Sequence, residues 1–186
     1  PILSKLGGTD WIKHKTRVKG KVKEIAKNLL DLSAKRKLLK GYAYLEDDEE
    51  QLLFENKFEY TETADQLKSI EEIKKDMQLE YPMDRLLCGD VGYGKTEVAF
   101  RAIFKAIKSG KQAALLCPTT ILSNQHYENA LKRFSGFGVN IEVLNRFVTP
   151  KKQEIILREV ESGKIDLIIG THKLLNEKIN CASHLY

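Results

Sequence analysis

The stretch CGDVGYGKTEV, residues 88–98, contains the pattern G-x-x-x-x-G-K-T between Gly89 and Thr96. Glycines at this spacing let the backbone curl so that its amide N–H groups point at phosphate oxygens. Lys95 is placed to reach the terminal phosphates as the catalytic cation, and the Thr96 hydroxyl is placed to hold Mg²⁺. The stretch therefore predicts a site for a nucleoside triphosphate and Mg²⁺, with these candidate ligands: Gly89, Asp90, Gly92, Gly94, Lys95, Thr96 and Glu97.

The sequence around this loop alternates short apolar runs with helical stretches. Four runs have the length and continuous hydrophobicity of strands that are buried on both faces: RLLC (85–88), QAALLC (112–117), IEVL (141–144) and IDLIIG (165–170). Helical stretches follow Lys95, Ile121 and Pro150, and Gly110 and Gly163 end the first and the last of them. This succession predicts an α/β fold with a parallel sheet and right-handed crossovers, in which ligands bind beyond the carboxyl ends of the strands.

Polar residues follow three of these runs. The sequences PTT (118–120), NRF (145–147) and GTH (170–172) place hydroxyl, amide and guanidinium groups at the carboxyl edge of the sheet. Such groups suit the phosphates of a nucleic-acid strand. Taken singly, each sequence is more typical of a helix N-cap or a loop, but three of them at one edge of one sheet favour a nucleic-acid site. His172 has no Ser, Cys or carboxylate partner placed to make it a catalytic base, so we interpret it as structural or phosphate-facing.

An aromatic residue and an amide lie upstream, in FEYTETADQ (58–66). The Phe58 ring could cover the face of an adenine, and the Gln66 amide could pair with the donor and acceptor edge of the base. The structural alternative is that Phe58 packs in the core and that Gln66 completes a capping box with Thr63. The capping pattern predicts a helix that begins after Thr63 and ends before Pro82, with one apolar face: Leu67, Ile70, Ile73 and Met77.

The amino-terminal part of the chain divides sharply by charge. Residues 1–41 carry 12 Lys and Arg against 3 Asp and Glu, whereas residues 42–80 carry 4 against 13. Residues 13–40 predict one long helix, because apolar residues recur every three or four positions: Val18, Val22, Ile25, Leu29 and Leu32. Its basic residues either face a polyanion such as nucleic acid or form the solvated side of an amphipathic helix that lies on the next domain. The acidic run LEDDEEQ (45–51) is typical of a surface loop.

The composition excludes several classes of protein. With 186 residues, of which 42% are hydrophobic and 31% charged, the chain suits one core with an appendage. No apolar run approaches the length of a membrane span, and the start PILSKLGGTDW lacks the layout of a secretion signal, so we expect a cytoplasmic location and no membrane partner. Cys88, Cys117 and Cys181 form no C-x-x-C pair, which predicts buried reduced thiols instead of a disulfide or a zinc site.

Several segments, in their order and spacing, resemble the first motor lobe of superfamily 2 nucleic-acid translocases, and more closely that of the bacterial transcription-repair coupling factors. They are FEYTETADQLKSIEEIKKDM, PMDRLLCGDVGYGKTEVAFRA, PTTILSNQHYE, LNRF and IIGTHKLL. The resemblance continues upstream through LGGTDWIKHKTRVKGKVKEIAKNLLDL. RecG-like recombination helicases resemble the motor part too, but LGGTDW and the Lys-rich helix favour the coupling factors.

The resemblance implies a RecA-like P-loop NTPase lobe with ATP and Mg²⁺ as cofactors. It divides the chain into the tail of a polymerase-interaction module (1–12), a long basic linker helix (13–41) and the first motor lobe (42–186). Phe58 and Gln66 would recognise adenine, and one strand of double-stranded DNA would run along these residues: Thr119, Thr120, Arg146, Thr171 and His172. Through the parent protein, RNA polymerase and excision-repair proteins would be partners, and the parent's activity would be ATP-driven displacement of stalled RNA polymerase.

The pattern lacks one element that hydrolysis needs. Translocases of this kind use an apolar strand that ends in Asp-Glu, whose carboxylates support Mg²⁺ and activate water. Here the sequence continues after IIGTHKLL through NEK into INCASHLY (179–186), which has no Asp-Glu, and Asp166 begins its strand instead of ending it. Without this motif and a second motor lobe with its arginine finger, we expect an incomplete lobe that binds ATP and DNA with little or no turnover. Alternatives are a regulatory module that uses nucleotide only as a ligand, and a RecG-like helicase fragment. A small-molecule kinase is disfavoured, because no acceptor base or Arg-rich lid follows the loop.

Overall fold

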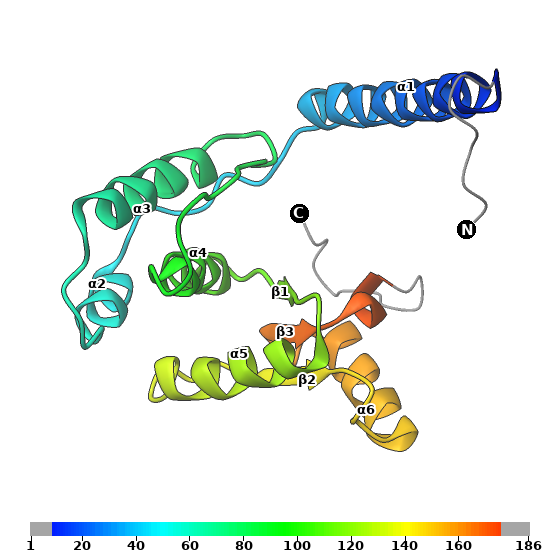
Figure 1. Ribbon diagram of the computed structural model, residues 1–186. Coiled ribbons are helices and arrows are strands. Elements are labelled where there is room, and N and C mark those ends of the chain that lie inside the picture. The colour runs from blue at the N-terminus through cyan, green and yellow to red at the C-terminus, as the bar shows by residue number, and fades with distance from the viewer. Residues whose placement is uncertain (1–8, 176–186) are drawn as a thin grey trace.

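The computed structural model describes residues 9–175 (Figure 1). Predictions that concern residues 1–8 and 176–186, including Cys181 and INCASHLY, lie outside the described residues. The elements in chain order are α1 (Thr9–Leu38), α2 (Glu49–Asn56), α3 (Ala64–Met77), α4 (Lys95–Lys108), β1 (Ala113–Leu116), α5 (Thr120–Arg133), β2 (Ile141–Leu144), α6 (Pro150–Glu161), β3 (Leu167–Gly170) and the 3₁₀ helix η1 (His172–Leu175).

A parallel sheet lies at the centre of the lobe, as the alternating pattern predicts. Its strand order is β1-β3-β2, so each connection through α5 and α6 is a crossover. Gly170 at the end of β3 pairs in register with Leu116 at the end of β1 and with Leu144 at the end of β2. The three carboxyl ends therefore meet at one edge of the sheet.

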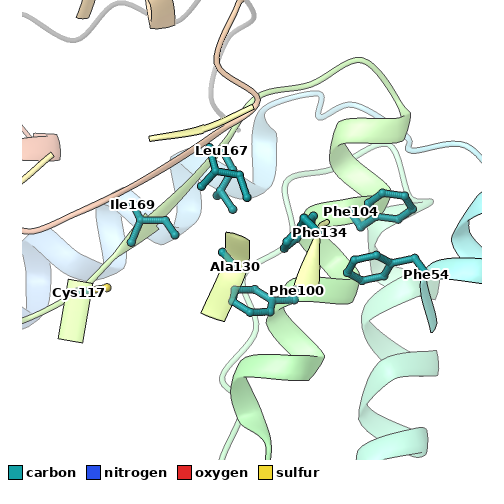
Figure 2. Packing of buried hydrophobic residues seen from close by; sticks show 9 residues of the cluster. Phe54, Phe100, Phe104, Cys117, Ala130, Phe134, Leu167 and Ile169 are labelled. Atoms are coloured by element: carbon teal, nitrogen blue, oxygen red, sulfur yellow. The ribbon is translucent and has the colours of Figure 1, made fainter. Parts of the chain in front are cut away.

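Helices cover both faces of the sheet (Figure 1). Successive strand residues point to opposite faces, so Leu167 and Ile169 join one core while Ile168 joins another. The larger core contains side chains from α2, α4, α5 and the sheet, seen from close by in Figure 2. Within it, the rings of Phe54 and Phe104 stack with their centroids 4.2 Å apart. On the opposite face, Ile156 and Val160 of α6 are buried against the sheet.

The run RLLC (85–88) is not a strand, which corrects the prediction. Within residues 9–175 the strand pairing joins β1, β2 and β3, so RLLC has no neighbouring strand with which to form a ladder. Leu86 is 86% exposed, while Leu87 packs against the cluster between α3 and α4. Cys88 is consequently exposed, against the prediction of a buried thiol, whereas Cys117 is buried and its burial raises the pKa of the thiol.

The acidic run at 45–51 is only partly a loop, which is a second correction. The Asp48 carboxylate accepts a hydrogen bond from the Gln51 backbone N–H at 2.8 Å and so caps α2. Gln51 is 2% exposed, and Phe54 is fully buried one turn later. Glu49 and Glu50 occupy the first turn, where negative side chains interact favourably with the helix dipole. The acidic letters thus belong to the solvated start of an amphipathic helix.

The long basic helix predicted for residues 13–40 is present as α1, which begins at Thr9 and includes Trp11. It extends away from the lobe (Figure 1), and its apolar stripe is exposed, with Ile25 at 59% and Leu29 at 61%. The structure therefore does not show the alternative in which this stripe lies on the domain that follows. None of the helices within residues 9–175, α1 included, is long and apolar enough to cross a membrane.

Candidate functional site

The glycine-rich loop has the backbone that its sequence predicts. Gly92 and Gly94 have φ angles of 82° and 66°, in the left-handed region where side chains are disfavoured. Gly94 is the N-cap of α4, and among the described residues no side chain caps this end of the helix. The first N–H groups of α4 are therefore left for another acceptor, and an anion fits this position.

Lys95 lies folded against the loop. Its ammonium group donates to the backbone carbonyls of Gly89 and Asp90, each at 2.5 Å. These residues line a cavity of about 260 Å³ beside the loop. A phosphate that entered this cavity would compete for the ammonium group, because charge-assisted hydrogen bonds are stronger than those to neutral carbonyls.

A larger cavity of about 860 Å³ lies next to the loop. This volume is in the range of small-molecule sites in proteins. The structure brings together around it residues from both predicted parts of the nucleotide site: Phe58, Gln66, Gly92, Gly94, Thr96 and Glu97. The two cavities share Thr63, Gln66 and Tyr93 as walls. The adenine candidates and the phosphate loop are thus neighbours in space, although they are about 30 residues apart in sequence.

Gln66 connects α3 with the loop. Its Oε1 accepts a hydrogen bond from the Thr63 N–H at 2.8 Å, which completes the predicted capping box. Its Nε2 donates to the Tyr93 carbonyl at 2.9 Å. The capping alternative for Gln66 is therefore confirmed, and the same amide also contacts the phosphate loop.

Phe58 is half-buried in the wall of the larger cavity. Its ring meets that of Tyr60 edge-on, with centroids 5.5 Å apart. The guanidinium groups of Arg101 and Arg133 lie 5.6 and 5.8 Å from the ring centroid, within the range of cation–π contacts. Phe58 is held by these contacts and is not part of the phenylalanine core shown in Figure 2.

Glu97 is a buried carboxylate at the first turn of α4. It accepts hydrogen bonds from Arg101 Nε at 2.9 Å and from Arg133 Nε and Nη2 at 2.8 and 2.6 Å. The candidate ligand Glu97 is thus engaged in ion pairs at the cavity wall. Neither arginine was predicted as part of the site, although the i, i+4 spacing of Glu97 and Arg101 on one helix indicates the first ion pair.

The five nucleic-acid candidates lie at the carboxyl edge of the sheet, as predicted. Thr119 is also the N-cap of α5, because its hydroxyl accepts from the Leu122 N–H at 3.2 Å. Thr171 is 5% exposed after β3, and His172 begins η1. Arg146 is exposed beside Phe147, with its guanidinium group 5.2 Å from the ring centroid. The candidates without a buried side chain are available to a ligand along this edge: Thr119, Thr120, Arg146 and His172.

Asn145 organises this edge, and sequence reasoning gave it no separate role. It is 1% exposed, and its Nδ2 donates to Ser123 Oγ at 3.0 Å and to Asn124 Oδ1 at 2.7 Å. Its Oδ1 accepts from the Phe147 N–H at 3.0 Å. Asn145 therefore fixes the loop that carries Arg146 against α5.

The parallel sheet, the loop before α4 and the polar edge define an α/β lobe of the helicase type, and comparison with known proteins agrees. Residues 63–185 match the family model of DEAD/DEAH box helicases, and the chain belongs to this family. Members of the family generally depend on ATP and Mg²⁺. Among the described residues, no group of three or more His, Cys, Asp or Glu is placed to hold a metal ion by itself.

Within the family, the chain is similar to transcription-repair-coupling factors. It is 53% identical to that of Borreliella burgdorferi, 54% to that of Bacillus subtilis and 53% to that of Staphylococcus aureus. Each match covers 96% of this chain and 15–16% of the relative, so the chain spans less than a fifth of their length. A solved structure of RecG bound to a three-way DNA junction matches with a TM-score of 0.76 and 35% identity, over 81% of this chain and 21% of RecG.

Proposed function

We propose that this chain is the ATP-binding part of a DNA translocase that couples DNA repair to transcription by displacing stalled RNA polymerase. The observation that supports it best is the cavity that joins the glycine-rich loop to Phe58 and Gln66, in a chain more than half identical to coupling factors. Displacement of polymerase and recruitment of excision-repair proteins would belong to the longer protein. In that protein α1 would link a polymerase-interaction module to the motor lobe.

The loop residues would bind the triphosphate and Mg²⁺. The uncapped N–H groups of α4 would face phosphate oxygens, Lys95 would exchange its two carbonyl partners for phosphate, and Thr96 would hold the metal ion. Bound Mg²⁺ would neutralise charge on the phosphates. Phe58 would cover the adenine, and Gln66 would present its amide to the edge of the base from its position between the two cavities.

The carboxyl edge of the sheet would bind one strand of double-stranded DNA. Its exposed hydroxyl, imidazole and guanidinium groups suit sugar and phosphate oxygens, which carry no sequence information. The identity to RecG, whose solved structure holds a DNA junction, supports DNA as the ligand. Arg146 would contribute most among these residues, because it is exposed and always charged.

Binding without turnover is the expected behaviour of the 186 residues. Hydrolysis needs a strand that ends in Asp-Glu and an arginine from a second lobe, and neither is present in this sequence. Glu97, the carboxylate that follows the loop at the first turn of α4, is committed to Arg101 and Arg133. It is therefore badly placed to activate water.

DNA binding can be tested with Arg146→Ala. The variant should lower the affinity for a fluorescent duplex by about three- to tenfold in an anisotropy titration and reduce the salt dependence by about one phosphate contact. Arg158→Ala removes the same charge from an exposed position on α6 and is the matched control. Equal loss of affinity in the two variants, or no loss in either, would contradict the assignment of this edge.

A further inference from the structure

One arginine forms ion pairs with three carboxylates near Phe58, the candidate ring for adenine. Arg101, on α4, is 3% exposed. It donates to Glu62 through Nη2 and to Glu97 through Nε, the latter at 2.9 Å, and its Nη1 lies 3.8 Å from Glu55. These three carboxylates come from different parts of the chain: the segment before α3, α4 itself and α2. A buried guanidinium group with this many partners has its orientation fixed.

The segment that carries Phe58 depends on such contacts for its position. The Phe58 N–H still donates to the Glu55 carbonyl at the end of α2, at 3.1 Å, but residues 59–62 form neither helix nor strand. Glu62 is the residue before the N-cap Thr63, and it forms the ion pair with Arg101. The hydrogen bond from Arg101 is the main cause that lowers the pKa of Glu62, so this carboxylate stays ionised to a lower pH than an ordinary glutamate does.

The same guanidinium group also faces the aromatic ring. Its Cζ lies 5.6 Å from the centroid of Phe58, so Arg101 contacts the segment at both ends, at Phe58 and at Glu62. Arg101 is also only six residues after Lys95 on the same helix. One rigid helix therefore holds the phosphate loop at its start and the aromatic wall of the cavity from its second turn.

We propose that Arg101 is a positioning residue for adenine: through Glu62 it holds the Phe58 ring at the wall of the larger cavity, at a fixed place relative to the phosphate loop. The role depends on the proposed ATP site. In that site the Phe58 ring would bind the base, whereas the loop and Lys95 would bind the phosphates, so the two contributions to ATP affinity can be measured separately. Loss of the Arg101–Glu62 contact should therefore weaken binding of the base and leave binding of the phosphates intact.

The test uses Glu62→Gln in the 186-residue chain. This variant removes one carboxylate charge but leaves Arg101 paired with Glu97 and Glu55, so the buried cation keeps its partners. We expect about tenfold weaker binding of Mg-ATP by calorimetry, from the loss of one charge-assisted hydrogen bond, and tripolyphosphate affinity within a factor of about two of the wild type. Glu71→Gln, an exposed neutral substitution on α3, is the matched control and should change neither affinity.

A loss of Mg-ATP affinity without a loss of tripolyphosphate affinity distinguishes a positioning role from a general effect on the fold. If Glu62→Gln binds ATP as the wild type does, or loses ATP and tripolyphosphate affinity equally, the inference is overturned while the proposed ATP site stands. If the wild-type chain binds neither ligand, the proposed function fails and this inference fails with it. Arg101→Lys keeps the charge but lacks the planar fork, and it should show the same split, so the proposal can be checked with a second variant.

Discussion

The glycine-rich loop (Gly89–Thr96) depends on glycines in a backbone conformation that few other residues tolerate. At Gly94 the φ angle is 66°, and a Cβ atom there would also meet the Gln66 side chain. The amide that joins α3 to the loop would have to move. A single methyl group at this position therefore acts on the backbone and on the contact between the two parts of the site.

We predict that Gly94→Ala destabilises the protein by about 1–2 kcal/mol, the cost of a left-handed non-glycine residue, and weakens ATP binding. Gly20→Ala is the control, because Gly20 lies in α1 and a Cβ there would have no neighbour within 4 Å. It should stabilise α1 slightly, by up to ~1 kcal/mol. Thermal unfolding measures both, and a Gly94→Ala protein as stable as the wild type would contradict the account of the loop.

Local contacts at the residue scale could be predicted, whereas distant ones could not. The capping box of Thr63 and Gln66 depends on residues three positions apart, and the sequence pattern states it directly. The ion pair of Arg101 and Glu62 joins residues 39 positions apart. No periodicity links such residues, so only the packing of α4 against the preceding segment reveals the pair. The role of Asn145 could not be predicted for the same reason, because its partners Ser123 and Asn124 lie more than 20 positions away.

Among the secondary-structure elements, a predicted strand is confirmed where it pairs with another strand of the described chain. The runs at 112–117, 141–144 and 165–170 contain β1, β2 and β3. RLLC has the same apolar letters, but hydrophobicity alone does not provide a neighbouring strand. The prediction of a loop at the acidic run was wrong in part, because charged residues also occupy the exposed first turn of a helix. Glu49 and Glu50 lie in the first turn of α2, and the buried Phe54 follows them.

The basic face of α1 can be tested as an element. Reversing the charges of Lys15, Lys19 and Lys23 to Glu should weaken DNA binding at low salt by about tenfold or more, because several exposed charges act together on a polyanion. ATP affinity should remain unchanged, since no α1 residue is among those that line the two cavities and α1 extends away from the lobe (Figure 1).

Lysine-to-arginine changes at the same three positions keep the charge and serve as the control. Anisotropy with duplex DNA and calorimetry with ATP give the two affinities. A parallel loss of both would show that α1 supports the fold of the lobe instead of acting on a separate ligand. That result would contradict the assignment of α1 as a linker outside the motor lobe.

At the scale of the whole molecule, the chain corresponds to a small part of its relatives. It covers 15–16% of each coupling factor that it resembles, yet it contains the complete glycine-rich loop and the polar edge of the sheet. We therefore propose that binding and turnover are separable in this chain. The residues proposed to hold ATP are present, whereas those needed to cleave it are not in this sequence.

We therefore predict that the purified chain releases no more phosphate from ATP in the presence of duplex DNA than its Lys95→Ala variant does. A coupled phosphate assay over several hours is sufficient to compare the two proteins. Release by the wild-type chain that exceeds the variant and rises with DNA would contradict the prediction, because it would require a water-activating carboxylate within these residues.

We propose above all that the loop between Gly89 and Thr96 binds ATP. Calorimetric titration of the folded chain with Mg-ATP tests it most directly, with Lys95→Ala beside Lys151→Ala, an exposed lysine on α6 that lies outside both cavities. The wild type and Lys151→Ala should bind saturably, and Lys95→Ala should show no measurable binding, because the phosphates lose their cation. Absence of heat with the wild-type chain, or Lys95→Ala affinity within a factor of about two of the wild type, would contradict this proposal.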